Sequence, residues 1–204
     1  MKTDSGHNLR IPYATGLVLA LLIIGFAGST QLVDAAMTYE IDATHSMIIF
    51  RAKHSGVSYN YGRFNDFTGE ITMDEDISKS TVELEVKTAS VDTANNKRDQ
   101  HLRSSDFFSA KQFPVITFKS TKVSMKEGEN DMLEVTGDLE LHGVKKSITV
   151  DVEITGRGKN REGGSLIGFE STFAIKRSEF GMTYGIGNVS DDIRLTISVE
   201  AEEK

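Results

Sequence analysis

The chain has 204 residues and a formal net charge of −7, from 23 Lys and Arg against 30 Asp and Glu. That length fits one domain plus a tail, and a hydrophobic content of 38% excludes wholesale disorder and a polytopic membrane protein. The acidic balance argues against nucleic-acid binding and against strong adhesion to anionic membrane surfaces, since both depend on clustered cations. The absence of cysteine excludes a disulfide framework, a thiolate metal site and a cysteine nucleophile.

Residues 1–36 have the layout of a secretory signal peptide. Lys2 and Arg10 precede an uncharged stretch from Ile11 to Val33, and small residues at positions 35 and 36 offer a cleavage site. Cleavage would leave residues 37–204 as a domain outside the cytoplasm. The alternative is an uncleaved anchor, because the uncharged stretch is long enough to span a bilayer.

Apolar and polar residues alternate along most of the remaining chain, which predicts β-strands with one dry face and one wet face. The run 82–87 is the clearest case, because Val82, Leu84 and Val86 alternate with charged residues. The same period occurs in residues 48–53, 116–119, 133–141, 148–154, 167–175 and 193–200, and the run 64–73 completes about eight strands. Short polar or Gly-rich breaks indicate antiparallel neighbours. We therefore expect an all-β domain, either an antiparallel eight-stranded barrel or a sandwich.

Residues 93–114 interrupt the alternation. We expect one short helix there, from Asn96 to Phe108, before Pro114 starts the next strand. The segment carries Arg98, His101 and Arg103. It is either a surface helix with solvated charges or a polar rim at the mouth of the barrel.

The inward-facing positions are aliphatic or phenylalanine, so any cavity inside the barrel would be apolar. A packed core and a lipid pocket have the same composition, and the pattern does not separate them. Strand parity gives these candidate pocket residues: Ile48, Phe50, Phe64, Phe67, Val82, Leu84, Val86, Ile116, Phe118, Leu139, Leu141, Ile148, Val150, Phe169, Phe173, Phe180, Ile193 and Leu195.

The histidines beyond residue 36 have no metal-binding spacing, so we expect no metal site. His45 is expected in a turn or cap hydrogen bond, His54 inside the barrel, and His142 in a hairpin turn before Gly143.

A hydrolase would need a nucleophile, a base and an orienting group. Ser46, His54 and Asp92 are the available set, but no nucleophile elbow accompanies them. We therefore expect no catalytic residues and no enzyme activity.

A series of short motifs resembles a known family, and together the motifs cover residues 39–201. They are His45-Ser46, Phe50, His54, Gly62-Arg63-Phe64, Phe67, Gly69, Ser90-Val91-Asp92-Thr93, Arg98-Asp99, His101-Leu102, Asp106-Phe107-Phe108, Phe113-Pro114, Thr117-Phe118-Lys119-Ser120, Leu139, Leu141-His142-Gly143-Val144-Lys145, Arg177-Ser178-Glu179-Phe180-Gly181 and Val189-Ser190-Asp191-Asp192. Each motif is weak alone, but their number and order resemble the YceI-like polyisoprenoid-binding family. One departure is Glu179, where the family more often has Asp.

The resemblance implies a lipocalin-like barrel with a hydrophobic tunnel, in a periplasmic or secreted protein that is often a homodimer. It implies a bound isoprenoid, or a quinone-like or fatty-acid-like lipid, and no other cofactor. The lipid head group would then be read at the barrel mouth by His54, Arg98, His101 and Arg103.

Three functions stay open from the sequence. The first is a carrier, sequesterer or sensor of a lipid. The second is an interaction module, related to stress, whose barrel is filled by its own side chains. The third is an enzyme that acts on a lipid held in the barrel.

Overall fold

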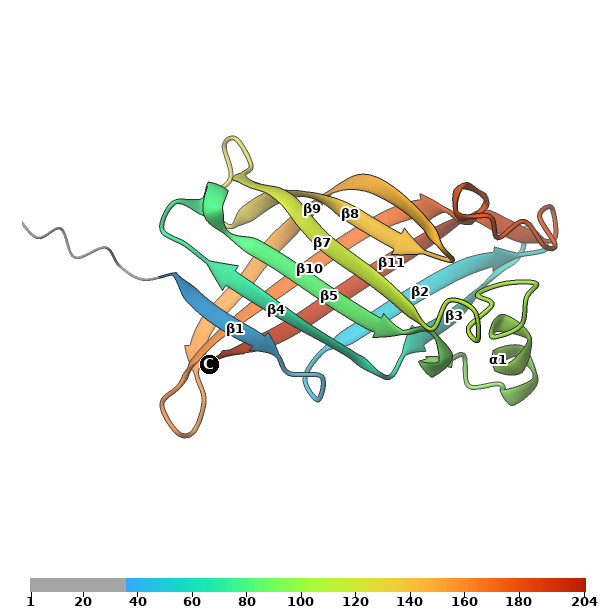
Figure 1. Cartoon of the computed structure of the whole chain (residues 1–204), viewed down its shortest axis with the longest axis horizontal. Coiled ribbons are helices and arrows are strands. Elements are labelled where there is room, and N and C mark those ends of the chain that lie inside the picture. The colour runs from blue at the N-terminus through green and yellow to red at the C-terminus, as the bar shows by residue number, and fades with distance from the viewer. Residues whose placement is uncertain (1–35) are drawn as a thin grey trace, which may run out of the picture. The chain divides into compact units, whose positions relative to one another are not determined.

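The computed structural model describes residues 36–204, which form one antiparallel sheet that closes on itself (Figure 1). The expected signal peptide lies outside the described residues except for its last position. The strands are β1 (Met37–Ile41), β2 (Met47–His54), β3 (Ser58–Phe64), β4 (Phe67–Met73), β5 (Thr81–Lys87), β6 (Val91–Asp92), β7 (Val115–Met125), β8 (Met132–Leu141), β9 (Val144–Lys159), β10 (Ser165–Lys176) and β11 (Val189–Glu203).

The order around the barrel is β1, β4, β5, β7, β8, β9, β10 and β11, and β11 pairs with β1 to close the ring. The remaining strands continue this set at one end: β2 follows β1, β3 precedes β4 and β6 follows β5. The predicted antiparallel eight-stranded barrel is therefore confirmed, with three of its strands each broken into two.

The first break lies where β11 changes partner. Its early residues pair with β2 and its last residues pair with β1. Between them, the Ser46 hydroxyl accepts a hydrogen bond from the Glu200 amide at 3.0 Å and lies 3.3 Å from the Glu200 carbonyl oxygen. The Ser46 side chain thus satisfies the Glu200 amide at the break, while the Asp42 amide donates to the Glu200 carbonyl at 2.9 Å.

The second break corrects the prediction of one strand over residues 64–73. The chain kinks at Asn65 and Asp66, where the Asn65 amide donates to the Ser90 carbonyl and the Lys87 amide donates to the Asp66 carbonyl. These polar residues bond outside the regular ladder, so β3 and β4 are separate strands. The sequence pattern also missed β1 and most of β3.

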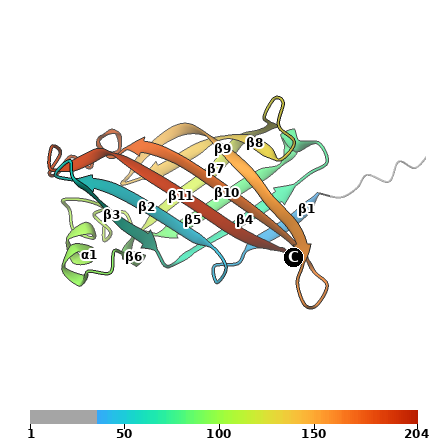
Figure 2. The ribbon, with the colours of Figure 1, turned by 180° about the vertical axis from the view of Figure 1, so that it is seen from behind.

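The chain between β6 and β7 holds α1 (Asn96–Leu102), which lies at the same end of the barrel as β3 and β6 (Figure 2). The Asn95 side chain caps the helix by accepting from the Arg98 amide. The predicted helical end at Phe108 is wrong. Ser104 bonds back to the His101 carbonyl and also accepts from the Asp106 amide, which turns the chain out of the helix.

Short 3-10 helices, at Ile77–Lys79, Thr88–Ser90 and Arg177–Phe180, complete the described secondary structure. Within residues 36–204, no helix has the length and apolar content needed to cross a membrane.

Candidate functional site

An apolar cavity of about 150 Å³ lies inside the barrel. Most of the predicted pocket residues line it: Ile48, Phe64, Val82, Leu84, Val86, Ile116, Phe118, Leu139, Ile148, Val150, Phe169, Phe173 and Leu195. Strand parity found them because successive side chains of a strand point to opposite faces.

The other predicted pocket residues lie outside the lining. Phe67 is buried in the core, and Phe50 packs beside the cavity against Phe64. Leu141 and Phe180 belong to a second apolar cluster with Met182. Ile193 is half-buried on β11 opposite Ala52.

The candidate list omitted a further group of apolar lining residues: Ile41, Ile71, Met73, Val123, Leu133, Val135, Val152, Ile197 and Val199. Most of them lie on strands that were recognised, at the same parity as the chosen residues. Ile41 lies on the short β1, which the alternation did not identify.

The cavity is long and narrow. Its lining on β8 runs from Leu133 to Leu139, which corresponds to about 20 Å of extended strand. Two polar lining side chains are engaged elsewhere: the Ser171 hydroxyl donates to the Asp151 carbonyl at 2.6 Å, and the Ser80 hydroxyl accepts from the Asp74 amide at 3.0 Å. The space therefore suits a slender apolar chain.

Aromatic rings pack beside the cavity at the α1 end. Phe108 lies edge-on to Phe64 at a centroid distance of 5.6 Å and to Phe50 at 6.5 Å. Gly62 makes this packing possible, because a Cβ there would lie 2.3 Å from the Phe50 ring. We call Phe50, Phe64 and Phe108 the aromatic plug.

Buried polar groups hold the segment that carries Phe108. The Asp99 carboxylate, 5% exposed, accepts from both the amide and the hydroxyl of Thr93. Arg98 donates to the Thr93 hydroxyl and carbonyl, both at 2.8 Å. Arg103 donates to the carbonyls of Ala89 and Val91 at 2.7 and 2.6 Å. Both predicted head-group arginines thus bond to the protein's own backbone.

The other predicted head-group residues are exposed at this end. His101 bonds to Asp106 at 2.9 Å and packs edge-on to Phe107 and Tyr184. His54 ends β2 and lies near Ser55 and Asn188. The expectation that His54 is buried is wrong, because β2 extends to the hairpin turn and its last side chain lies beyond the packed interior.

A buried arginine organises the loop that contains Tyr184. Arg177 is 3% exposed and donates to the carbonyls of Met182, Tyr184, Val189 and Ser190 at 2.7 to 3.1 Å. Loss of hydration lowers the pKa of Arg177. The motif Arg177–Gly181 was recognised in the sequence, but the role of Arg177 in binding these carbonyls was not predicted.

The residue after Arg177 binds the carboxylate of a second motif, Val189–Asp192. Ser178 donates two hydrogen bonds to the Asp191 carboxylate, and they hold the pKa of that carboxyl below its usual range. The motifs 177–181 and 189–192, which flank the Arg177 loop, are therefore joined directly at one end of the barrel.

The remaining histidines take the roles expected of them. The Nδ1 atom of His45 lies 2.6 Å from the Asp42 carboxylate, which confirms the turn hydrogen bond. His142 and Gly143 both have positive φ in the tight turn between β8 and β9, as that hairpin type requires.

The conceivable catalytic set is not assembled. Ser46 precedes β2 and His54 ends it, so about 26 Å of extended strand separates them. Glu200 lies 3.8 Å from His45, and with Asp42 these side chains form a group of metal-ligand type in which His45 is exposed and the two carboxylates are half-buried. The turn's own hydrogen bond already engages the Nδ1 atom of His45.

Comparison with known proteins agrees with the fold and the motifs. The YceI-like domain model matches residues 39–201. A UPF0312 protein of Pseudomonas aeruginosa is 40% identical over 185 residues, covering 89% of this chain and 95% of its own. The crystal structure of a Campylobacter jejuni YCEI protein is 40% identical with a TM-score of 0.65, over 74% of this chain and 90% of its own.

A more distant structure shares the fold alone. The polyisoprenoid binding domain from Saccharophagus degradans is 19% identical with a TM-score of 0.64, and the match covers 82% of this chain and 99% of that domain. The family match spans the whole barrel from β1 to β11. The chain therefore belongs to the YceI-like domain family.

Proposed function

We propose that the barrel binds one linear lipid chain, with an isoprenoid as the first class to test, and serves as a carrier, sequesterer or sensor outside the cytoplasm. The long apolar cavity is the observation that carries this proposal. A hydrocarbon chain gains roughly 0.8 kcal/mol for each methylene removed from water, so a dry channel binds it without polar contacts.

The volume sets a condition on binding. A cavity of about 150 Å³ in another protein holds a ligand of benzene size, and the cavity here has a similar volume. A long chain therefore requires the barrel to widen or the aromatic plug to move. Phe108 is the plug residue that can move most readily, because it lies in the irregular segment between α1 and β7 rather than in a strand.

The head group then lies at the α1 end. Arg98 and Arg103 already bond to backbone carbonyls, so they would act there by holding the segment in place. His54 and His101 are exposed and remain the polar groups available to a ligand.

The test fills the cavity from one strand. Val150 on β9 lines the cavity, whereas Val144 on the same strand packs against the second apolar cluster. Residues 36–204 of the wild type, Val150→Phe and Val144→Phe are titrated with a fluorescent long-chain fatty acid, with a prenyl alcohol as competitor. We expect Val150→Phe to weaken binding at least about tenfold, with little change for Val144→Phe.

The alternative is an interaction module with a filled barrel, and the small size of the cavity favours it. Mass spectrometry of an organic extract of the native protein separates the two. A stoichiometric lipid supports the carrier. A clean extract, together with equal probe binding by wild type and Val150→Phe, contradicts it.

A further inference from the structure

Exposed apolar side chains gather at the α1 end of the barrel. Val57 in the β2–β3 turn is 84% exposed, and Tyr59, Tyr61, Tyr184 and Ile186 are each about half exposed. The β2–β3 turn and the 181–188 loop are joined, because the Ser55 amide donates to the Asn188 carbonyl at 2.6 Å. These residues therefore form one apolar tip from two adjacent loops and the outer face of β3.

Three cations lie directly behind this tip. Arg51 and Arg194 are opposite each other on β2 and β11, and Lys53 is opposite Tyr59. Within residues 36–204, none of the three lies within 4.0 Å of a carboxylate. Like charges directly opposite each other destabilise a sheet, so the fold itself gives no reason for this pair.

The cations are combined with tyrosines. The Arg51 guanidinium lies 4.2 Å from the Tyr59 ring centroid and donates to the Tyr61 hydroxyl at 3.3 Å. The Lys53 ammonium lies 5.8 Å from the Tyr59 ring. Asp192, two residues before Arg194 on β11, is paired with Lys176 at 2.9 Å, so it does not neutralise the patch.

We propose that this end docks on a lipid bilayer with anionic head groups: Val57 and Ile186 enter the head-group region, and Arg51, Lys53 and Arg194 contact the phosphates. Tyrosine with lysine or arginine behind an apolar tip is the arrangement expected at a membrane interface, because rings and aliphatic stems enter while charged ends stay wet. The net charge of −7 repels the same membrane from other faces, so the patch also orients the barrel. The proposal concerns the outer surface and does not depend on what occupies the cavity.

The test uses residues 36–204, which contain the closed barrel and the whole family domain. Flotation with phosphatidylglycerol–phosphatidylcholine vesicles measures partitioning of the wild type and of Arg194→Glu. This variant places opposite charges on β2 and β11, so the fold is kept while the charge of the three-residue patch falls from +3 to +1. We expect partitioning to fall about thirtyfold, and the wild type to be released by salt.

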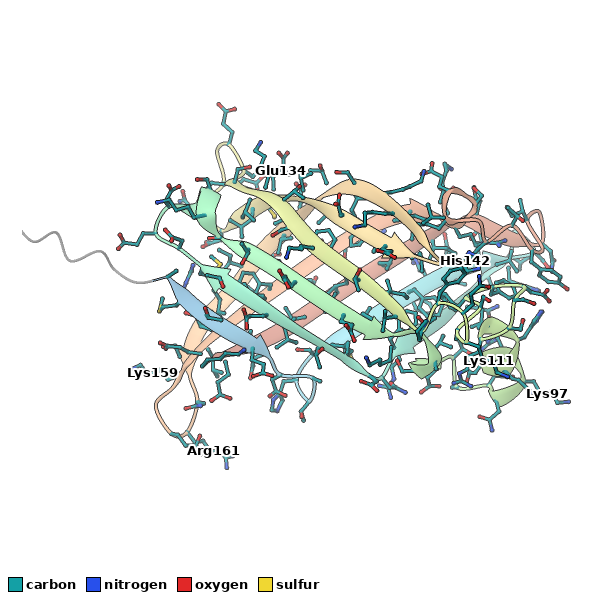
Figure 3. The ribbon with its side chains drawn as sticks, viewed as in Figure 1. Lys97, Lys111, Glu134, His142, Lys159 and Arg161 are labelled. Carbon is teal, nitrogen blue, oxygen red and sulfur yellow. The ribbon has the colours of Figure 1, made fainter. Side chains whose placement is uncertain are left out.

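The control makes the same charge change at the far end. Lys159 ends β9, and Figure 3 shows it at the opposite end from Lys97 and Lys111. Lys159→Glu should retain at least a third of wild-type partitioning. Equal loss in Arg194→Glu and Lys159→Glu would overturn the proposal, as would equal wild-type binding to vesicles of phosphatidylcholine alone. Concentration-dependent dimerisation that is lost in Arg194→Glu, without vesicle binding, would assign the patch to a second copy of the chain instead.

Discussion

Arg177 gives the most direct test of how the α1 end is held together. Its guanidinium donates to four carbonyls around the 181–190 turn, and the bond to the Met182 carbonyl is fully buried. Replacement by methionine keeps most of the volume and removes every donor. The Met182 carbonyl would then lose its partner at a cost of ~1–3 kcal/mol, while the half-buried carbonyls regain some water.

Adding ~0.5–1 kcal/mol for each of the three half-buried bonds gives a total loss of about 2.5–6 kcal/mol in the free energy of unfolding. Urea denaturation of residues 36–204 measures this loss. Hydrogen exchange shows where the structure loosens. The Val189 amide donates to the Gly185 carbonyl at 2.9 Å, and it should lose its protection first.

Two variants serve as controls. Arg177→Lys keeps the charge but loses the planar fork, so it should be intermediate. Arg161→Met lies in the exposed turn after β9 and should change stability by less than about 0.5 kcal/mol. A loss below about 1 kcal/mol in Arg177→Met, with unchanged exchange of Val189, would refute the reasoning.

Two further predictions concern the plug and the first break. Gly62→Ala should cost ~1–3 kcal/mol, because its Cβ would meet the Phe50 ring at 2.3 Å; Gly158→Ala, with open space, should be neutral in the same denaturation series. The Asp42 hydrogen bond raises the pKa of His45 in the folded protein. The stability that His45 contributes is therefore fully present below the histidine pKa of the unfolded chain, and it is lost as pH rises through the pKa of the folded protein. His45 in turn lowers the pKa of Asp42, whose contribution is lost as pH falls. The dependence of the free energy of unfolding on pH should be weaker in His45→Gln than in the wild type. An unchanged dependence would contradict a contribution from the His45–Asp42 hydrogen bond.

The long strands could be predicted because burial of one strand face produces an alternation of apolar and polar residues within a few consecutive positions. Val82, Leu84 and Val86 show it on β5, and all three line the cavity. The breaks were not predictable in this way. The kink before β2 depends on Ser46 meeting Glu200, which is 154 residues away in the chain.

The candidate site was predicted less completely. Side-chain parity indicates which residues face inward but not how tightly they pack, so a cavity and a solid core look alike. The sequence also left the role of Arg98 and Arg103 open, because a cation that reads a ligand and a cation that binds backbone carbonyls are the same residue type. Only the positions of the Thr93 and Val91 carbonyls distinguish the two.

The closing pair of strands ties the folding of the domain to both ends of the chain. β1 bonds to β4 on one side and to the last residues of β11 on the other, and the Lys204 amide donates to the Thr38 carbonyl at 3.0 Å. Contacts this distant in sequence form slowly. In a chain that emerges N-terminus first, one edge of β1 therefore stays unpaired until Ala201 to Glu203 are available. Pairing of β1 with β11 is then the final step that closes the barrel.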